Sequence, residues 1–428
     1  MSARRKKAAL TPWQRKRRRL LSVVGLAALL FSVVMFWRIQ LASEVRWQIQ
    51  GLRDAGVPLD LPSLNQRHPV PAETENGATE FRAAWMNLRI PDPVLMAQLP
   101  FKPNREIAVG KAIPPEQRTA MVALVTGNES SLAHCKAGAA RKTTRYIETY
   151  TPSYDRSAMN AHLPMVNDLV SLLCSDSLLK SETGDSHGAL DALGTALAVA
   201  RSLEGDGLYE SLSTQWELEK LVLTSLVRLL SQASYRAEEL MVFSAYFSPE
   251  RRVAQWQRMC DTEQCLFVSR FRQGRKRGFM RSVLIAGGVG DLNLRLYFGL
   301  AGAARSGFGA TSEEQRRLQA EYQRLAAEVD GGPMIYRTTA IRMPPAPWNL
   351  MVAQWEEAVF ADVFLAIFGY HAREGVYPAT LDELVPDFFD DGLPTRLDST
   401  PIPYAVHSDG FRIGDDDQWL ATSTPVAP

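Results

Sequence analysis

The stretch "GDSHGALDALGTALAVARSLEGDG", residues 184–207, indicates that this chain is built mainly from helices. Its apolar residues return every three or four positions, which is the period of a helix with one buried face. Those residues are Leu190, Leu193, Leu197, Ala200 and Leu203. Asp185 or Ser186 is placed to cap the start of the helix, and Gly205 is placed to end it.

The next stretch, "LYESLSTQWELEKLVLTSLVRLLSQA", repeats this period, so we expect the two helices to form an antiparallel hairpin. The hairpin resembles a tetratricopeptide unit, whose second helix opens in a similar way. No second copy follows at the repeat length of about 34 residues, and one unit cannot build a solenoid. We therefore predict a mainly α fold, an irregular helical bundle that contains one tetratricopeptide-like hairpin.

The organisation of the whole chain follows from its composition. Prolines are frequent in residues 43–115, which predicts a connecting region with short helices. Residues 116–345 have helical spacing and form the expected helical domain. Residues 346–428 form a small α+β tail. With 428 residues, 46% of them hydrophobic and 22% charged, the chain has the composition of an ordered globular protein.

The N-terminus differs sharply in charge from the rest of the chain. Nine Lys and Arg residues lie within residues 1–19, and the first acidic residue is Glu44. Without those nine, 39 basic residues face 47 acidic residues, which leaves about −8 on the remainder. The two ends of the chain are therefore suited to different surroundings.

An apolar run, "LLSVVGLAALLFSVVMFW" at residues 20–37, follows the basic segment. At about 1.5 Å per residue it covers roughly 27 Å, close to the hydrocarbon thickness of a bilayer. It is longer than the apolar region of a signal peptide and lacks a good cleavage site. We predict an uncleaved single-pass anchor at residues 20–42 in the inner (cytoplasmic) membrane. Because clustered Lys and Arg stay inside, the N-terminus is expected in the cytoplasm and the later domains on the periplasmic side.

The tail begins with "REGVYPATLDELVPDFF" at residues 373–389, after a helix expected from 348 to 373. Gly375 can end that helix, Pro378 prevents its resumption, and Thr380 can cap a short helix near residues 381–385. Strands are expected near 402–406 and 411–413. This order is similar to the globular tail of type II secretion major pseudopilins.

The resemblance implies the shape of that tail without filament assembly. A prepilin-peptidase site is missing, and "LDSTPIPYAV" replaces the family's calcium loop. More broadly, "LRDAGVPLDLPSLNQRHPVPAETENGATEFRAAW", the helical hairpin and the tail occur in an order that resembles membrane-anchored, planctomycete-type bacterial envelope proteins. That group has no established activity, so the resemblance implies topology and no reaction.

The motif "GDSHG" at residues 184–188 matches G-x-S-x-G, in which Ser186 would be a hydrolase nucleophile. That nucleophile requires a preceding strand, and the residues before it have helical spacing. We therefore expect Ser186 to start or cap a helix, with a serine hydrolase as an alternative. The carboxylates of "EEAVFAD" at residues 356–362 are typical of a solvated helix face and less often of a catalytic pair.

A basic stripe with two aromatic residues lies in "SRFRQGRKRGFMRS", residues 269–282. Its cations are Arg270, Arg272, Arg275, Lys276, Arg277 and Arg281. Beyond a membrane, anionic lipid headgroups or an acidic protein partner fit this stripe better than nucleic acid does. An ordinary solvated helix face remains the alternative.

The sequence predicts no cofactor and no metal site. The six histidines are scattered, and none lies near the four cysteines, Cys135, Cys174, Cys260 and Cys265. These cysteines are expected as free thiols or as a disulfide, and a continuous helix would separate Cys260 from Cys265.

The function expected overall is a membrane-anchored envelope scaffold or protein-interaction module. The membrane contact is expected through residues 20–42, and an accessory part of a secretion or pilus-like system is the other alternative.

Overall fold

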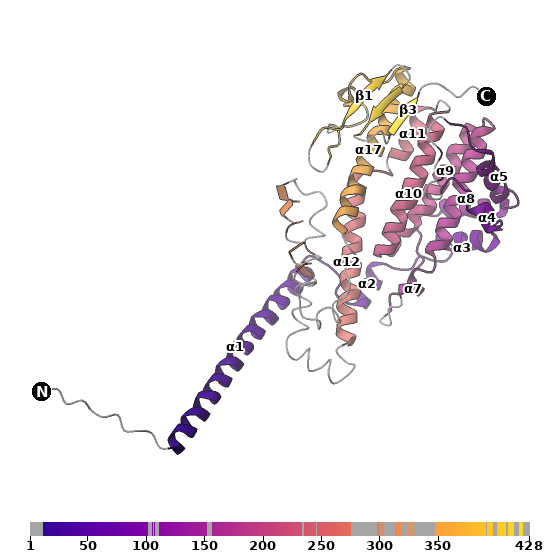
Figure 1. Cartoon of the computed structure of the whole chain (residues 1–428). Helices are drawn as coiled ribbons and strands as arrows, with labels where there is room; N and C mark the ends of the chain where they lie inside the picture. Colours follow the sequence, from indigo (N-terminus) through magenta and orange to yellow (C-terminus); the bar gives the residue numbers. More distant parts are fainter. Residues whose placement is uncertain are drawn as a thin grey trace.

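The structure, a computed structural model, is mainly helical with one small sheet (Figure 1). It describes residues 12–274 except 102–104, 106, 108–110, 152–155, 233–234 and 245, scattered positions between 298 and 327, and residues 347–422 except 391, 397–399, 408–409 and 415–418. The N-terminal helices are α1 (Pro12–Asp54), α2 (Leu61–Arg67), α3 (Gly77–Asn87), α4 (Pro93–Met96), α5 (Pro115–Val125), α6 (Glu129–Ala139) and α7 (Arg156–Met159). The body continues with α8 (Leu163–Glu182), α9 (Ser186–Arg201), the 3-10 helix η1 (Ser202–Asp206), α10 (Tyr209–Leu230), α11 (Ala237–Ser244) and α12 (Pro249–Gly274). The last elements are α17 (Pro347–Glu374), the 3-10 helix η2 (Leu381–Leu384), β1 (Tyr404–His407), β2 (Gly410–Ile413) and β3 (Trp419–Thr422).

Helix α8 lies at the centre of the body and packs against α3, α5, α9 and α10. Every residue from 169 to 178 is buried. A helix that is buried on all sides needs apolar or small residues around its whole circumference. The sequence meets this need with leucines, a valine, serines and a cysteine, and the one acidic residue there, Asp176, pairs with Lys180 at 2.7 Å. The short helices predicted between residues 43 and 115 are also present, as α2, α3 and α4.

The buried face predicted for α9 is confirmed. All five of its predicted apolar positions are at most 6% exposed. Asp185 is the N-cap, and its carboxylate accepts a hydrogen bond from Gly188 N at 2.9 Å. The predicted end at Gly205 is wrong, because η1 continues the turn and Gly207, with φ +61°, takes the left-handed position. Helix α9 packs on both α8 and α10, so the structure does not confirm a tetratricopeptide-like hairpin.

Helix α1 is longer than the predicted anchor. The sequence predicted a connecting region from residue 43, whereas the helix continues without a break to Asp54. Beyond the apolar run, Val45 is buried in a cluster with Phe267 and Val268 of α12, and Ile49 and Leu52 pack against it. The helix projects away from the body at its other end (Figure 1). One continuous helix therefore joins the apolar run to the folded body.

The predicted order of the tail is confirmed. Gly375, with φ +75°, follows α17, and η2 begins with a capping box between Thr380 and Glu383. The strands pair antiparallel in the order β1-β2-β3. Fully buried Phe411 packs against Phe364 and Phe368 of α17, with ring centroids 5.7 and 5.5 Å apart. Since α17 also packs on α11 and α12, the core of the tail is continuous with that of the helical body.

Candidate functional site

The basic stripe predicted as a contact surface lies largely outside the described residues. Arg270 and Arg272 belong to the last turns of α12, and their side chains are outside the described part of the structure. Arg275, Lys276, Arg277 and Arg281 are outside it altogether. The membrane or acidic-partner contact of this stripe therefore stays a prediction.

Ser186 is the first residue of α9 and follows the helix α8 and a turn, so the strand that a nucleophile elbow requires is not there. The neighbouring His187 has an 86% exposed side chain and lies 3.7 Å from Glu239. It does not form a base for Ser186. The position has the geometry of a helix start, as the residues before it indicated.

We expect Asp185→Ala to lower the free energy of unfolding by about 1 kcal/mol, because it removes the N-cap acceptor of α9. The matched change Ser186→Ala should stay within about 0.5 kcal/mol of wild type, since Ser186 provides no cap. Urea unfolding of both variants measures the difference. Equal stability of the two variants would contradict this cap, and loss of labelling by a serine-hydrolase probe in Ser186→Ala would reinstate the hydrolase.

The carboxylates of the "EEAVFAD" stretch on α17 take separate partners. Asp362 accepts a hydrogen bond from Ser244, and Glu356 lies 3.4 Å from Arg396. Burial raises the pKa values of both Glu357 and Asp362. These contacts hold α17 against its neighbours and do not form a catalytic pair.

All four cysteines are buried, and the structure pairs none of them in a disulfide. Cys260 and Cys265 lie on the continuous helix α12, so the predicted separation of their side chains holds. Burial raises the pKa of Cys135 and of Cys174 to about 12. Thiols of this kind are poor nucleophiles, because the thiolate is the reactive form.

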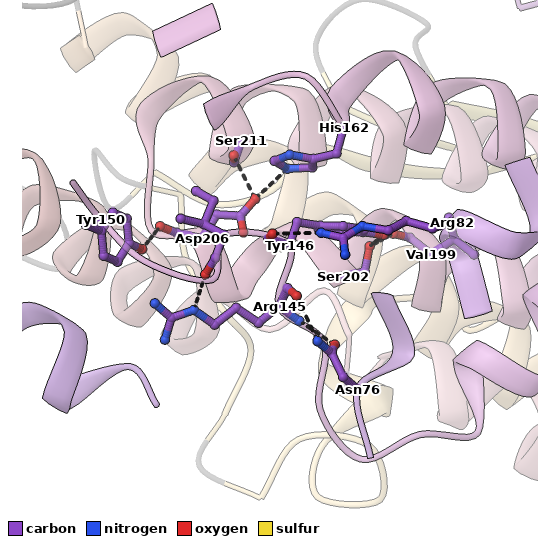
Figure 2. A network of polar contacts seen from close by, with 11 residues as sticks. Asn76, Arg82, Arg145, Tyr146, Tyr150, His162, Val199, Ser202, Asp206 and Ser211 are labelled. Atoms are coloured by element: carbon purple, nitrogen blue, oxygen red, sulfur yellow. Dashed lines mark hydrogen bonds and ion pairs between the residues drawn. The ribbon is translucent and has the colours of Figure 1, made fainter. Parts of the chain in front are cut away.

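A buried polar network surrounds the segment 143–150, and no motif in the sequence predicted it (Figure 2). Asn76, the N-cap of α3, accepts hydrogen bonds from Ala78 N and Arg145 N and donates one to Arg145 O at 3.0 Å. Thr143 forms a single parallel bridge with Asn76. The segment therefore lies against the start of α3 as an added strand would.

Asp206 is the centre of this network and is fully buried. Its carboxylate accepts hydrogen bonds from His162 Nε2 at 2.7 Å and from Ser211 Oγ at 3.1 Å. The ring of His162 stacks on Tyr146, with centroids 4.4 Å apart, and the Tyr150 hydroxyl donates to Asp206 O (Figure 2).

The Asp206–His162 pair resembles half of a catalytic relay, but a relay needs a nucleophile and an approach for a substrate. Only 10% of the His162 side chain is exposed, and the hydroxyl that donates to the Asp206 carboxylate is that of Ser211 in the same buried cluster. Burial is also the main cause that raises the pKa values of Tyr146 and Tyr150. The network therefore holds the 143–150 segment in place.

Next to the network is an open cleft of about 580 Å³ between α2, α12 and the 143–145 segment. Its lining includes Arg67, His68, Arg145, Arg258 and Asp261. Burial, followed by the charges of Arg145, Arg258 and Arg67, lowers the pKa of His68 to about 4. His68 is therefore neutral near pH 7, and the guanidinium groups give the cleft its positive charge.

The glycines around this segment were the one local signal of the site. A Cβ on Gly205 would lie 2.5 Å from Thr144 O, and one on Gly77 would lie 2.7 Å from Thr144 Oγ1. Both positions need glycine because another chain segment passes against them. Among the described residues, no three His, Cys, Asp or Glu side chains are placed to hold a metal ion.

The protein is mainly helical, and one N-terminal helix is long and apolar enough to cross a membrane. Comparisons with protein families, with curated proteins and with solved structures gave no match for this chain.

Proposed function

We propose that the protein is a membrane-anchored scaffold or protein-interaction module of the cell envelope. The observation that carries the proposal is the division of α1 into two parts. None of the most apolar window of this helix is buried, whereas its last turns are packed against α12. Exposed apolar surface of this extent is stable in a bilayer and costly in water.

The nine cations before this helix favour a cytoplasmic N-terminus, with the folded body on the periplasmic side of the inner membrane. The resemblance to planctomycete-type envelope proteins supports the same topology. The body is mainly helical, and its polar network around Asp206 is engaged in packing. An accessory role in a secretion or pilus-like system is a second proposal, favoured by the order of α17, η2 and the sheet.

We expect the full chain to stay in the membrane fraction after washing at alkaline pH. Deletion of residues 20–37 should release it, because the apolar run is then gone. Deletion of residues 3–11 is the matched control, since it shortens the same terminus and keeps the run. Cell fractionation with immunoblotting measures the distribution. Release of the full chain by the wash, or sedimentation of the 20–37 deletion, would contradict anchoring by this helix.

A further inference from the structure

The cleft between α2, α12 and the 143–145 segment contains one buried cation that its surroundings do not pair. Arg67 lies 3.5 Å from Asp261, and Arg258 lies 3.5 Å from Glu204. Arg145 is only 4% exposed, and among the described residues neither of its Nη atoms has a hydrogen-bond partner.

The remaining contacts of Arg145 orient its guanidinium group. Its Nε donates to Ile147 O, and its guanidinium carbon lies 5.4 Å from the centre of the Tyr150 ring. The imidazole of His68 meets the same ring edge-on, with centroids 6.5 Å apart. Tyr150 therefore contacts both Arg145 and His68.

Burying a guanidinium group without a partner is strongly unfavourable unless a counter-charge or hydrogen-bond acceptors compensate. Burial is the main cause that lowers the pKa of Arg145, and Tyr150 and then Asp206 oppose that effect. Neither residue accepts a hydrogen bond from the Nη atoms of Arg145. Guanidinium groups bind carboxylate and phosphate oxygens with two parallel hydrogen bonds, which is what two free Nη atoms offer.

We propose that this cleft binds a small soluble molecule through a carboxylate or phosphate group held by Arg145. A volume of about 580 Å³ is in the range of sites for small molecules. Arg67, His68 and Arg258 line the same cleft as Arg145. The Tyr150 ring lies against both Arg145 and His68. The bound anion supplies the negative counter-charge that the Arg145 guanidinium group lacks in the free protein.

The position of the cleft favours a soluble ligand over a lipid headgroup, and this step rests on the proposed anchoring. Arg67 Nη1 donates to Gly56 O at 3.1 Å, which fixes the cleft beside the end of α1. From Arg38 to Asp54 the helix has 17 residues, about 25 Å at its usual rise. An upright helix holds the cleft well beyond the headgroups.

The test titrates the full-length protein in detergent with inorganic phosphate, while chloride keeps the ionic strength constant. We expect a saturable rise in melting temperature. We also expect a rise in the pKa of His68, which NMR of ¹³C-labelled histidine measures. Arg145→Gln should weaken phosphate binding at least tenfold.

Since Arg145→Gln also loses contacts to the 143–150 segment, a second variant keeps the test decisive. Gln257 is exposed on the cleft wall, so Gln257→Glu adds a carboxylate of the same shape. It should remove the response to phosphate and raise the pKa of His68 without any added anion. Absence of saturation in wild type, or equal phosphate affinity in wild type and Gln257→Glu, would overturn the site.

A further experiment distinguishes a soluble phosphate compound from a lipid headgroup as the source of the bound phosphate group. In nanodiscs of phosphatidylcholine alone and of phosphatidylcholine with phosphatidylglycerol, we expect the same His68 pKa. A higher pKa in the anionic discs would show that headgroups fill the cleft and would overturn the soluble ligand. The phosphate titration in detergent does not depend on the topology, so its failure is separate from a failure of the proposed anchoring.

Discussion

Arg252→Met should lower the free energy of unfolding by about 3 to 5 kcal/mol, because it leaves the carboxylate of Glu219 buried without its ion-pair partner. The two side chains are 2% and 1% exposed, at the contact between α10 and α12. Gln215 donates to the other oxygen of Glu219 at 2.7 Å, and Arg252 lies over the ring of Trp216. Urea unfolding of the full chain measures the loss.

A double variant is the control for this prediction. Arg252→Met with Glu219→Leu removes both charges and replaces them with apolar side chains of similar volume, which is often close to neutral in cost. The double variant should therefore recover most of the stability that the single variant loses. A single variant as stable as wild type would contradict the buried pair, and a double variant no better than the single would assign the loss to packing.

Leu384→Ala should expose the tail to proteolysis after about residue 375 and leave the helical body resistant. Leu384 is fully buried, and truncating such a leucine costs about 2 to 5 kcal/mol, which is large for a unit of this size. Val376→Ala is the matched control, because Val376 lies between α17 and η2 and is 62% exposed.

Limited proteolysis with mass spectrometry locates the cleavage. We expect Val376→Ala to be cut as slowly as wild type. Equal resistance of wild type and Leu384→Ala would contradict the packed tail. Simultaneous digestion of tail and body would show that the continuous core through α17 couples the two parts in one unfolding step.

The elements predicted well were those whose signals are local. The period of the apolar residues in α9, the cap at Asp185 and the order of Gly375, Pro378 and Thr380 each act within a few residues. Such signals are complete in the sequence itself, so both the buried face of α9 and the plan of the tail followed from it.

The elements missed were those that depend on distant partners. Leu41, Val45, Ile49 and Leu52 form a stripe at helical spacing, but Phe267, which lies in the same cluster as Val45, is more than two hundred residues further along. The sequence alone showed these apolar residues of α1, but it did not show the surface of α12 against which they pack. The helix therefore continues beyond the predicted anchor to Asp54.

The candidate site was missed for the same reason. Asn76, Arg145 and Asp206 belong to three separate segments, and none of them stands in a motif. Arg145 is one of three cations in "ARKTTRY", and the fold buries it while Arg141 and Lys142 stay exposed. A glycine such as Gly205 can indicate that another chain segment packs closely against it, but the sequence does not show which segment that is.

The central claim is that α1 crosses the inner membrane with the folded body outside the cytoplasm. Single cysteines test it directly, because the four native thiols are buried and react slowly. Met86 is 81% exposed on the body, and Ala9 lies in the basic N-terminal segment. In intact spheroplasts, a membrane-impermeant maleimide should label Met86→Cys, and it should label Ala9→Cys only after lysis. Labelling of Ala9→Cys in intact spheroplasts, with Met86→Cys protected until lysis, would contradict the account.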